Sequence, residues 1–240
     1  MFGERPAGVN RRVKGERSPP LDAAAGRDAG AKVRYARRTM QVAERITVTE
    51  DEYLGLERAA ETKHELVNGE IVAMAGGSPR HNAIAANVSG VLRTQLKDRP
   101  CIVFSSDQRI HVEATGLYTY ADVSVTCDRP RFHPKHKDTL LNPRVIVEVL
   151  SDSTEGYDRG AKFAHYRGLP SFQEYLLISQ HVALVEHYLR LETGQWILTA
   201  YQGETAIVKL PSLDCELPLA EVYDKLHLLA PEPPAPSGTE

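Results

Sequence analysis

Two acidic residues lie within apolar segments, where carboxylates are uncommon. Glu148 lies in the middle of VIVEVLSDST, 145–154, whose β-branched and apolar residues indicate a buried strand. Burying a carboxylate without a partner costs several kcal/mol, so Glu148 is expected to be paired, hydrogen-bonded or holding a metal. Asp122 lies in a second such segment, YTYADVSVTC, 118–127. With Lys162 shortly downstream, the two carboxylates predict a metal-dependent phosphodiesterase site.

Each of these residues also has a structural interpretation. Asp122 suits an edge strand or a turn, and Glu148 could bond a backbone group or an arginine. Asp158 and Lys162 are spaced i, i+4, which alone suits a surface ion pair of ~0.3–0.5 kcal/mol. A strand followed by a helix, however, can place Lys162 back over Glu148, and this favours the catalytic interpretation.

Glu65 and His81 are further candidates. Glu65 begins the predicted strand HELVNGE, where it could equally be an exposed residue beside Lys63 or His64. His81 ends the glycine-rich stretch AGGSPRH, at a predicted helix N-terminus. Free N–H groups and the helix dipole at such an end suit a phosphate group, although a plain loop and cap explain the stretch as well.

Other chemistries have little support in the chain. There is no GxSxG elbow, no GxxxxGK[ST] loop and no CxxC pair. The HPKHK stretch at 133–137 offers His133 and His136, but no third ligand is near them in the sequence. We therefore expect this stretch to be a solvated loop and not a zinc site.

The elements that must position the candidates follow from periodicity and turn signals. Thr49 and Glu52 form a capping-box signature for a short helix through about Ala60, and Ser78-Pro79 opens a second helix with one apolar face. Asn68-Gly69 predicts a hairpin inside 64–75. The remaining predicted elements are strands near 101–113, 118–127, 143–150, 173–179, 182–191 and 195–202, and helices near 157–168 and 219–227. The pattern predicts an α/β or α+β fold with one mixed sheet and helices packed on it.

Composition indicates one domain with tails. The chain has 240 residues, 42% hydrophobic and 25% charged. Residues 1–39 hold ten Lys/Arg against four Asp/Glu and show no apolar periodicity, so we predict a disordered basic extension, with Met40 as a candidate start. Residues 40–229 form the predicted domain, and the Pro-rich 230–240 is a predicted disordered tail. Because the net charge is −3, the chain beyond residue 39 carries −9, which argues against broad nonspecific binding of duplex DNA.

The three cysteines, Cys101, Cys127 and Cys215, are too few and too scattered for a disulfide framework, so we expect a reduced, cytoplasmic protein. No apolar run approaches the ~18 residues of a membrane span. The amino terminus lacks the apolar stretch of a secretory signal.

The chain resembles the Uma2 family (the DUF820 group) of restriction endonuclease-like proteins, within the PD-(D/E)XK nuclease superfamily. The resemblance covers about 45–228. It rests on HELVNGEIVAMAGGSPRHNAI, YADVSV, PRVIVEVLSDSTEGYDRGAKFAHYRGLPSFQEYLLIS and LPSLDCELPLAEVY. Its most specific part is EVLSDST followed by D-x-x-x-K-x-x-x-Y, and it implies a restriction-endonuclease-like mixed sheet flanked by helices.

The resemblance also implies roles for individual residues. Asp122 matches the first acidic ligand of the superfamily and Glu148 the second. The lysine expected two residues after the second acid is replaced by Leu150, and Lys162 matches a lysine that similar proteins carry on the next helix. Glu65 matches an additional acidic position on the first strand.

By the same resemblance the chain is expected to be an endonuclease that uses Mg²⁺ or Mn²⁺ and acts on DNA, with a homodimer as a further expectation. The backbone carbonyl of Val149 is an implied metal ligand, and His81 and Asp158 are candidate substrate contacts. Two alternatives stay open. One is a catalytically inactive nuclease-fold protein that binds nucleic acid or a protein, and the other is a metal-binding structural domain without a nucleic-acid partner.

Overall fold

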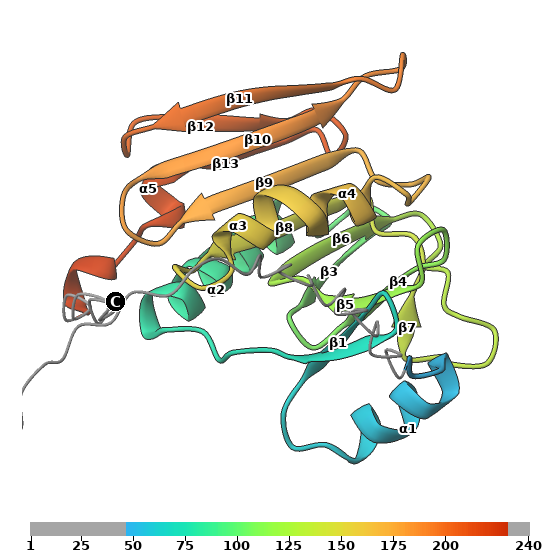
Figure 1. Cartoon of the computed structure of the whole chain (residues 1–240). Coiled ribbons are helices and arrows are strands. Elements are labelled where there is room, and N and C mark those ends of the chain that lie inside the picture. Colours follow the sequence, from blue (N-terminus) through green and yellow to red (C-terminus); the bar gives the residue numbers. More distant parts are fainter. Residues whose placement is uncertain (1–46, 230–240) are drawn as a thin grey trace, which may run out of the picture. The chain divides into compact units, whose positions relative to one another are not determined.

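Within residues 47–229 the strands form three separate sheets. The structure is a computed structural model that describes residues 47–229, all within one unit, Glu44–Glu240. The predicted extension over 1–39, Met40 and the tail over 230–240 lie outside the described residues. The largest sheet has six strands in the order β11-β10-β9-β8-β6-β3 (Figure 1). Its strands are β3 (Cys101–Ser105), β6 (Val123–Cys127), β8 (Val145–Leu150), β9 (Glu174–Ser179), β10 (Leu184–Arg190) and β11 (Trp196–Gln202).

A second sheet has five strands in the order β2-β1-β5-β4-β7. Its strands are β1 (His64–Val67), β2 (Glu70–Ala73), β4 (Arg109–Val112), β5 (Leu117–Tyr120) and β7 (Thr139–Leu140). The turn between β1 and β2 places Asn68 at φ 51° and Gly69 at φ 83°, which confirms the predicted hairpin. The third sheet is the antiparallel pair β12 (Ile207–Leu210) and β13 (Cys215–Pro218).

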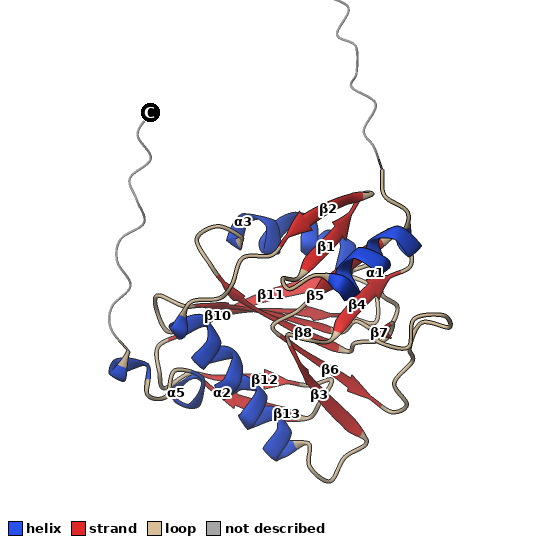
Figure 2. Ribbon diagram, turned by 90° about the horizontal axis from the view of Figure 1, so that it is seen from below, coloured by secondary structure: helices blue, strands red, loops and turns tan. Residues whose placement is uncertain are grey.

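The helices confirm the capping signals. Helix α1 (Glu50–Ala59) begins after Thr49, and the side chains of Thr49 and Glu52 form a complete capping box. Helix α2 (Pro79–Gln95) begins after Ser78, whose hydroxyl accepts from the backbone N–H of His81. Figure 2 shows α2 running beside β13 and β3. The other helices are α3 (Glu155–Tyr157), the π-helix η1 (Asp158–Lys162), α4 (Phe163–Tyr166), α5 (Leu219–Val222) and the 3₁₀ turn η2 (Leu226–Leu228).

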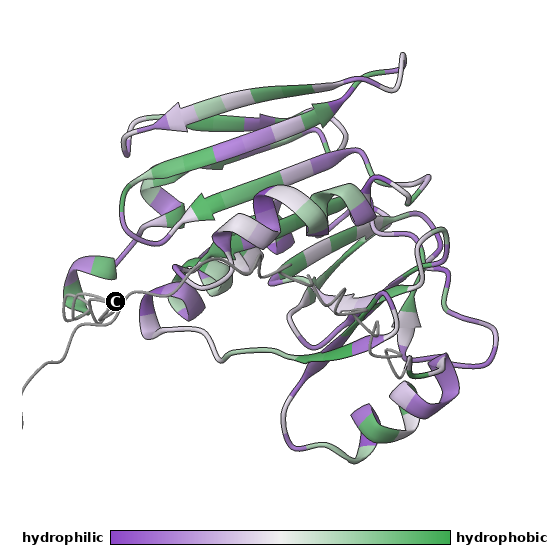
Figure 3. Ribbon diagram, in the orientation of Figure 1, coloured by the Kyte–Doolittle hydropathy of each residue, from purple (hydrophilic) through white to green (hydrophobic). Residues whose placement is uncertain are grey.

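Strand β8 is buried on both faces, and its alternation separates two apolar cores. Val145, Val147 and Val149 pack in the core that includes α2, β12 and β13. Ile146 and Leu150 pack in the opposite core with aromatic residues such as Tyr166 of α4. Because side chains alternate along a strand, Glu148 lies on the same face as Ile146 and Leu150, toward α4. Figure 3 shows that hydrophobic residues dominate β8 and β9.

The mixed α+β class is confirmed, but the prediction of one mixed sheet is wrong. The segment predicted as one strand over 118–127 is broken at Ala121-Asp122, and its halves β5 and β6 belong to different sheets. The segment predicted over 101–113 is likewise split into β3 and β4. The hairpin β12–β13 was not predicted, because Pro211 and Pro218 give its short strands the composition of a loop.

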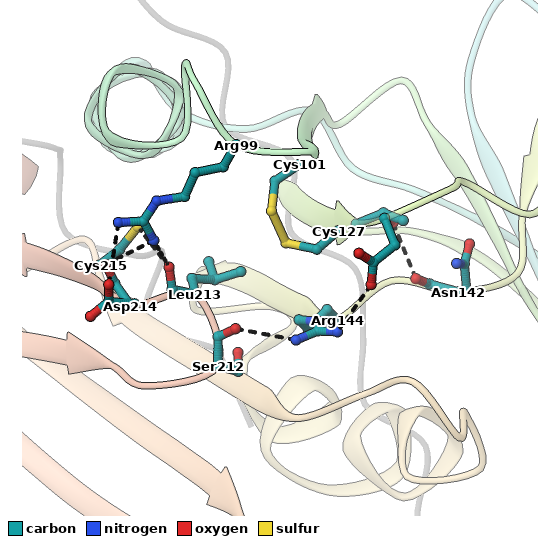
Figure 4. The surroundings of a disulfide bond; sticks show 11 residues. Arg99, Cys101, Cys127, Asn142, Arg144, Ser212, Leu213, Asp214 and Cys215 are labelled. Atoms are coloured by element: carbon teal, nitrogen blue, oxygen red, sulfur yellow. Dashed lines mark hydrogen bonds and ion pairs between the residues drawn. A yellow bond between two sulfur atoms is a disulfide. The ribbon is translucent and has the colours of Figure 1, made fainter.

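Cys101 and Cys127 are partners in the antiparallel register of β3 and β6 and form a disulfide (Figure 4). Cys215 is free and buried. The three cysteines are therefore not too scattered to pair, because residues 26 positions apart become neighbours once two strands align. The expectation of a reducing compartment loses this support.

Reducing this disulfide should destabilise the protein. A disulfide that closes a loop of this length restricts the unfolded chain. This restriction is expected to add about 3 kcal/mol to the free energy of unfolding. Urea unfolding with and without reductant measures the difference, and the double variant Cys101→Ala/Cys127→Ala should behave like the reduced protein. An unchanged midpoint after reduction would contradict the prediction.

Within residues 47–229, no helix is both long and apolar enough to cross a bilayer.

Candidate active site

Three carboxylates surround one buried ammonium group. The Nζ of Lys162 lies 3.0 Å from Glu148 Oε1, 3.4 Å from Glu65 Oε1 and 3.6 Å from Asp158 Oδ1. All four side chains are at most 6% exposed. The alternatives of a surface ion pair for Lys162 and an exposed Glu65 are therefore wrong, because the fold buries both side chains.

The π-helix places Lys162 at this point. It interrupts the helical run from α3 to α4, which follows β8 in the chain, and π-helical turns are rare and often occur at functional sites. The Nζ of Lys162 also donates to the backbone carbonyl of Tyr120, at 3.3 Å, at the end of β5. Lys162 thus connects β8 of the six-stranded sheet with β5 of the five-stranded sheet.

The carboxylates have further hydrogen-bond donors. The hydroxyl of Tyr166 donates to Glu148 Oε1 at 2.8 Å, and the hydroxyl of Thr119 donates to Glu65 Oε1. Neither donor was assigned a role from the sequence. Tyr166 is the last residue of the D-x-x-x-K-x-x-x-Y pattern, and its i+4 spacing from Lys162 places both on one helical face. Strand alternation places Thr119 on the opposite face from Tyr118 and Tyr120. Which of these faces points toward Glu65 could not be predicted until the orientation of the strand was known.

Asp122 lies in the break between β5 and β6 and contacts two other elements. Its Oδ2 accepts from the backbone N–H of Val149 at 2.7 Å and lies 3.1 Å from His81 Nε2. The Nδ1 of His81 is buried and has no hydrogen-bond partner among the described residues. Asp122 therefore joins β6, β8 and α2, and Val149 contacts it through its N–H group.

Burial is the largest influence on the electrostatics of this region. Burial raises the pKa of Glu148 to about 8, although Lys162 acts in the opposite direction, and burial also raises the pKa of Asp158. Burial tends to lower the pKa of Lys162, but the carboxylates of Glu148, Glu65 and Asp158 raise it well above its ordinary value. In the same way the contact with Asp122 outweighs burial and raises the pKa of His81.

By donor type the acidic residues suit a hard divalent cation, although the ligand atoms of Glu65, Asp122 and Glu148 do not all lie within 4.8 Å of one another. Glu65, Asp122 and Glu148 offer carboxylate oxygens, which Mg²⁺ and Mn²⁺ prefer. The cluster has more carboxylates than cationic groups, and Asp158 and Asp122 add to the effect of burial in raising the pKa of Glu148. The ammonium of Lys162 contacts both Glu65 and Glu148, so a divalent cation bound by these residues would have to share their oxygens with it.

Glu50, His133 and His136 form a second cluster. They are the one group of three or more such ligands in the described residues whose ligand atoms all lie within 4.8 Å of one another. The side chains of His133 and His136 are only 15% and 11% exposed, so the prediction of a solvated loop is wrong for these histidines. Glu50 could not be recognised as the third ligand from the sequence, because it lies far from the histidines in the chain.

The fold has a counterpart among solved nuclease-like proteins. A crystal structure described as a putative nuclease belonging to DUF820, from Anabaena variabilis, superposes with a TM-score of 0.61 over 73% of this chain and 97% of the other, at 22% identity. This similarity shows that the two proteins share a fold.

The sequence comparisons agree with the fold. A family model named Uma2 and described as "Putative restriction endonuclease" matches residues 50–220. Two uncharacterized proteins of Synechocystis sp. PCC 6803, sll1609 and slr1290, are 40% and 38% identical to this chain. These alignments span 71% and 72% of this chain, and 96% and 90% of the relatives. The chain belongs to the Uma2 family.

Proposed function

We propose that this protein is a metal-dependent endonuclease that hydrolyses phosphodiester bonds in DNA. The observation that carries the proposal is the contact of Lys162 with Glu148 and Glu65, deep in a protein of a nuclease-like family. Burying a lysine together with acidic residues where two sheets meet carries a large desolvation penalty, so stability alone does not explain the cluster. Such clusters occur where charge is needed for chemistry.

Asp122, Glu148 and Glu65 are the proposed ligands of Mg²⁺ or Mn²⁺, with the carbonyl of Val149 as an additional oxygen donor. A bound divalent cation would stabilise the negative charge that develops on the phosphate oxygens. Tyr166 and Thr119 hold the carboxylates of Glu148 and Glu65 in place through their hydroxyl groups.

Lys162 is proposed to position the attacking water and to offset charge on the phosphate. Its contacts with three carboxylates keep it in the ammonium form, so it acts as a donor and a fixed positive charge. Asp158 orients Lys162 from within the same π-helix. His81, with its raised pKa beside Asp122 and its position in the first turn of α2, is proposed to contact the substrate phosphate.

The described residues of one chain hold one such site, and cutting both strands of a duplex at one place requires two, so a homodimer is part of the proposal. Sedimentation measurements distinguish the monomer from the dimer. A cytoplasmic location also stays a prediction, against which the disulfide between Cys101 and Cys127 argues.

The proposed reaction is tested by removing the metal. We expect the full chain to nick supercoiled plasmid in Mg²⁺ or Mn²⁺ and to show no cleavage after treatment with a chelator, with recovery when the cation is restored. Single-stranded DNA and RNA, tested in parallel, identify the substrate. Retention of DNA in a gel-shift assay without cleavage under any of these conditions would contradict the proposal and favour a protein that binds nucleic acid without cutting it.

A further inference from the structure

The cluster of Glu50, His133 and His136 lies apart from the acidic site and shares no residue with it. Glu50 is in the first turn of α1, and the two histidines are in the loop between β6 and β7. The Nε2 atoms of His133 and His136 lie 3.3 and 3.9 Å from the same oxygen, Oε1 of Glu50. Both imidazoles therefore present a nitrogen to one carboxylate oxygen.

Backbone hydrogen bonds hold the histidine loop in shape. The N–H of His133 donates to the carbonyl of Thr139 at 2.9 Å, and the N–H of Thr139 donates to the carbonyl of His136 at 3.0 Å. The N–H of His136 in turn donates to Nδ1 of His133 at 3.2 Å. The two backbone contacts with Thr139 fix the loop relative to β7, so the cluster is not a chance meeting of long surface side chains.

The Nε2 of His136 is an unusual atom in this cluster. It is buried and makes no hydrogen bond within the described residues. The carboxylate oxygens near it are Oδ1 of Asp51, at 3.4 Å, and Oε1 of Glu50, at 3.9 Å. Leaving a buried polar atom unsatisfied costs ~1–3 kcal/mol, and a missing ion is one of its ordinary explanations. This atom is an observation independent of the spacing of the three ligands.

The donor types select a class of metal. Two imidazole nitrogens and one carboxylate oxygen suit Zn²⁺ and its neighbours Co²⁺ and Ni²⁺, whereas Mg²⁺ favours oxygen donors alone. We propose that Glu50, His133 and His136 bind a Zn²⁺-class ion that fastens α1 to the loop between β6 and β7. Asp51 or water completes the coordination.

Neighbouring residues orient one of the proposed metal ligands and also make hydrogen bonds that must break when the metal binds. The hydroxyl of Tyr118 donates to Oε1 of Glu50, the kind of contact that orients a metal ligand. Arg58 lies 3.2 Å from Nδ1 of His136, and it also makes two hydrogen bonds to Asp138, at 3.0 and 3.1 Å. When Nε2 binds a metal, the ring proton resides on Nδ1, so Arg58 must give up His136 and keep Asp138. The contact of the His136 N–H with Nδ1 of His133 must open in the same way.

Zinc titration of the full chain without an affinity tag tests the proposal. We expect one high-affinity Zn²⁺ per chain by calorimetry, Co²⁺ spectra typical of nitrogen and oxygen ligation, and a higher unfolding temperature in Zn²⁺. The double variant His133→Ala/His136→Ala should weaken binding more than about 100-fold, since replacing even a residue that only supports a ligand costs 10–100-fold. His181→Ala, at an exposed histidine paired with Asp152, is the matched control and should bind as the wild type does.

Two further variants keep the test decisive. Glu50→Gln retains the shape of the side chain and should weaken Zn²⁺ binding and abolish the thermal shift even if the double variant fails to fold. Glu148→Gln should retain the zinc site whether or not the protein cleaves DNA, because the two clusters share no residue. Absence of Zn²⁺ binding by the wild type, or binding that is lost in Glu148→Gln and kept in the histidine variant, would overturn the proposal.

Discussion

Replacing Glu148 with glutamine should abolish metal-dependent cleavage and leave the fold intact. Glutamine keeps an oxygen that can accept the hydrogen bond from Tyr166, but it removes a charged metal ligand. We expect cleavage to fall at least about 100-fold, the upper limit for replacing residues that only support a metal ligand. Plasmid nicking measures the loss, and circular dichroism verifies the fold. Asp122→Asn should have an effect of similar size.

The same variant should change the pH dependence of stability. Because the pKa of Glu148 is raised from 4.5 to about 8, the folded protein holds a proton that the unfolded chain has released over this range. Without metal, the contribution of this group to stability is therefore present below pH 4.5 and declines as the pH rises to about 8. Glu148→Gln should lack that decline, as urea unfolding at several pH values would show. Glu216→Gln, at an exposed position of β13, is the control.

Full cleavage by Glu148→Gln would refute the assignment of this residue.

Replacing Lys162 with methionine should separate catalysis from metal binding. We expect cleavage to fall at least about 100-fold, a loss within the ordinary range for removing a group that stabilises transition-state charge. Affinity for Mn²⁺ should persist or increase, because the ammonium no longer shares the oxygens of Glu148 and Glu65 with the ion. Calorimetry with Mn²⁺ and plasmid nicking measure the two effects on the same preparation.

Lys162→Met should also make folding more dependent on metal. Removing one partner of a buried ion pair destabilises proteins by about 3–5 kcal/mol, because the carboxylates are left without a counter-charge. The increase in unfolding temperature on adding Mn²⁺ should therefore be larger for this variant than for the wild type. Lys209→Met, at an exposed position of β12, is the matched control. A variant that loses Mn²⁺ binding together with activity would mean that Lys162 acts mainly in building the metal site.

Local signals in the sequence predicted the elements well. The capping residues Thr49 and Ser78, the Asn68-Gly69 turn and the apolar run of β8 each depend on neighbours within a few positions, and the structure has all of these elements. The contact of Lys162 with Glu148 follows from a strand and the helix after it, which bring nearby parts of the chain together. The catalytic roles of these residues stay predictions.

Features that depend on distant parts of the chain were not predictable in this way. The break at Ala121-Asp122 arises because β5 pairs with β1 and β4 while β6 pairs with β3 and β8, and pairing partners cannot be read from periodicity. The disulfide between Cys101 and Cys127 depends on the same register. Glu50 meets His133 only because α1 and the loop before β7 converge in three dimensions.

The break between β5 and β6 gives the proposed active site a particular vulnerability. Glu65 belongs to the five-stranded sheet and Glu148 to the six-stranded sheet. The distance between these carboxylates therefore depends on how the two sheets are placed relative to each other. We expect a core substitution that packs against the five-stranded sheet, for example at Leu54, to shift that sheet and misalign the carboxylates without contacting either of them. Loss of activity in this protein therefore does not by itself locate a mutation in the catalytic centre.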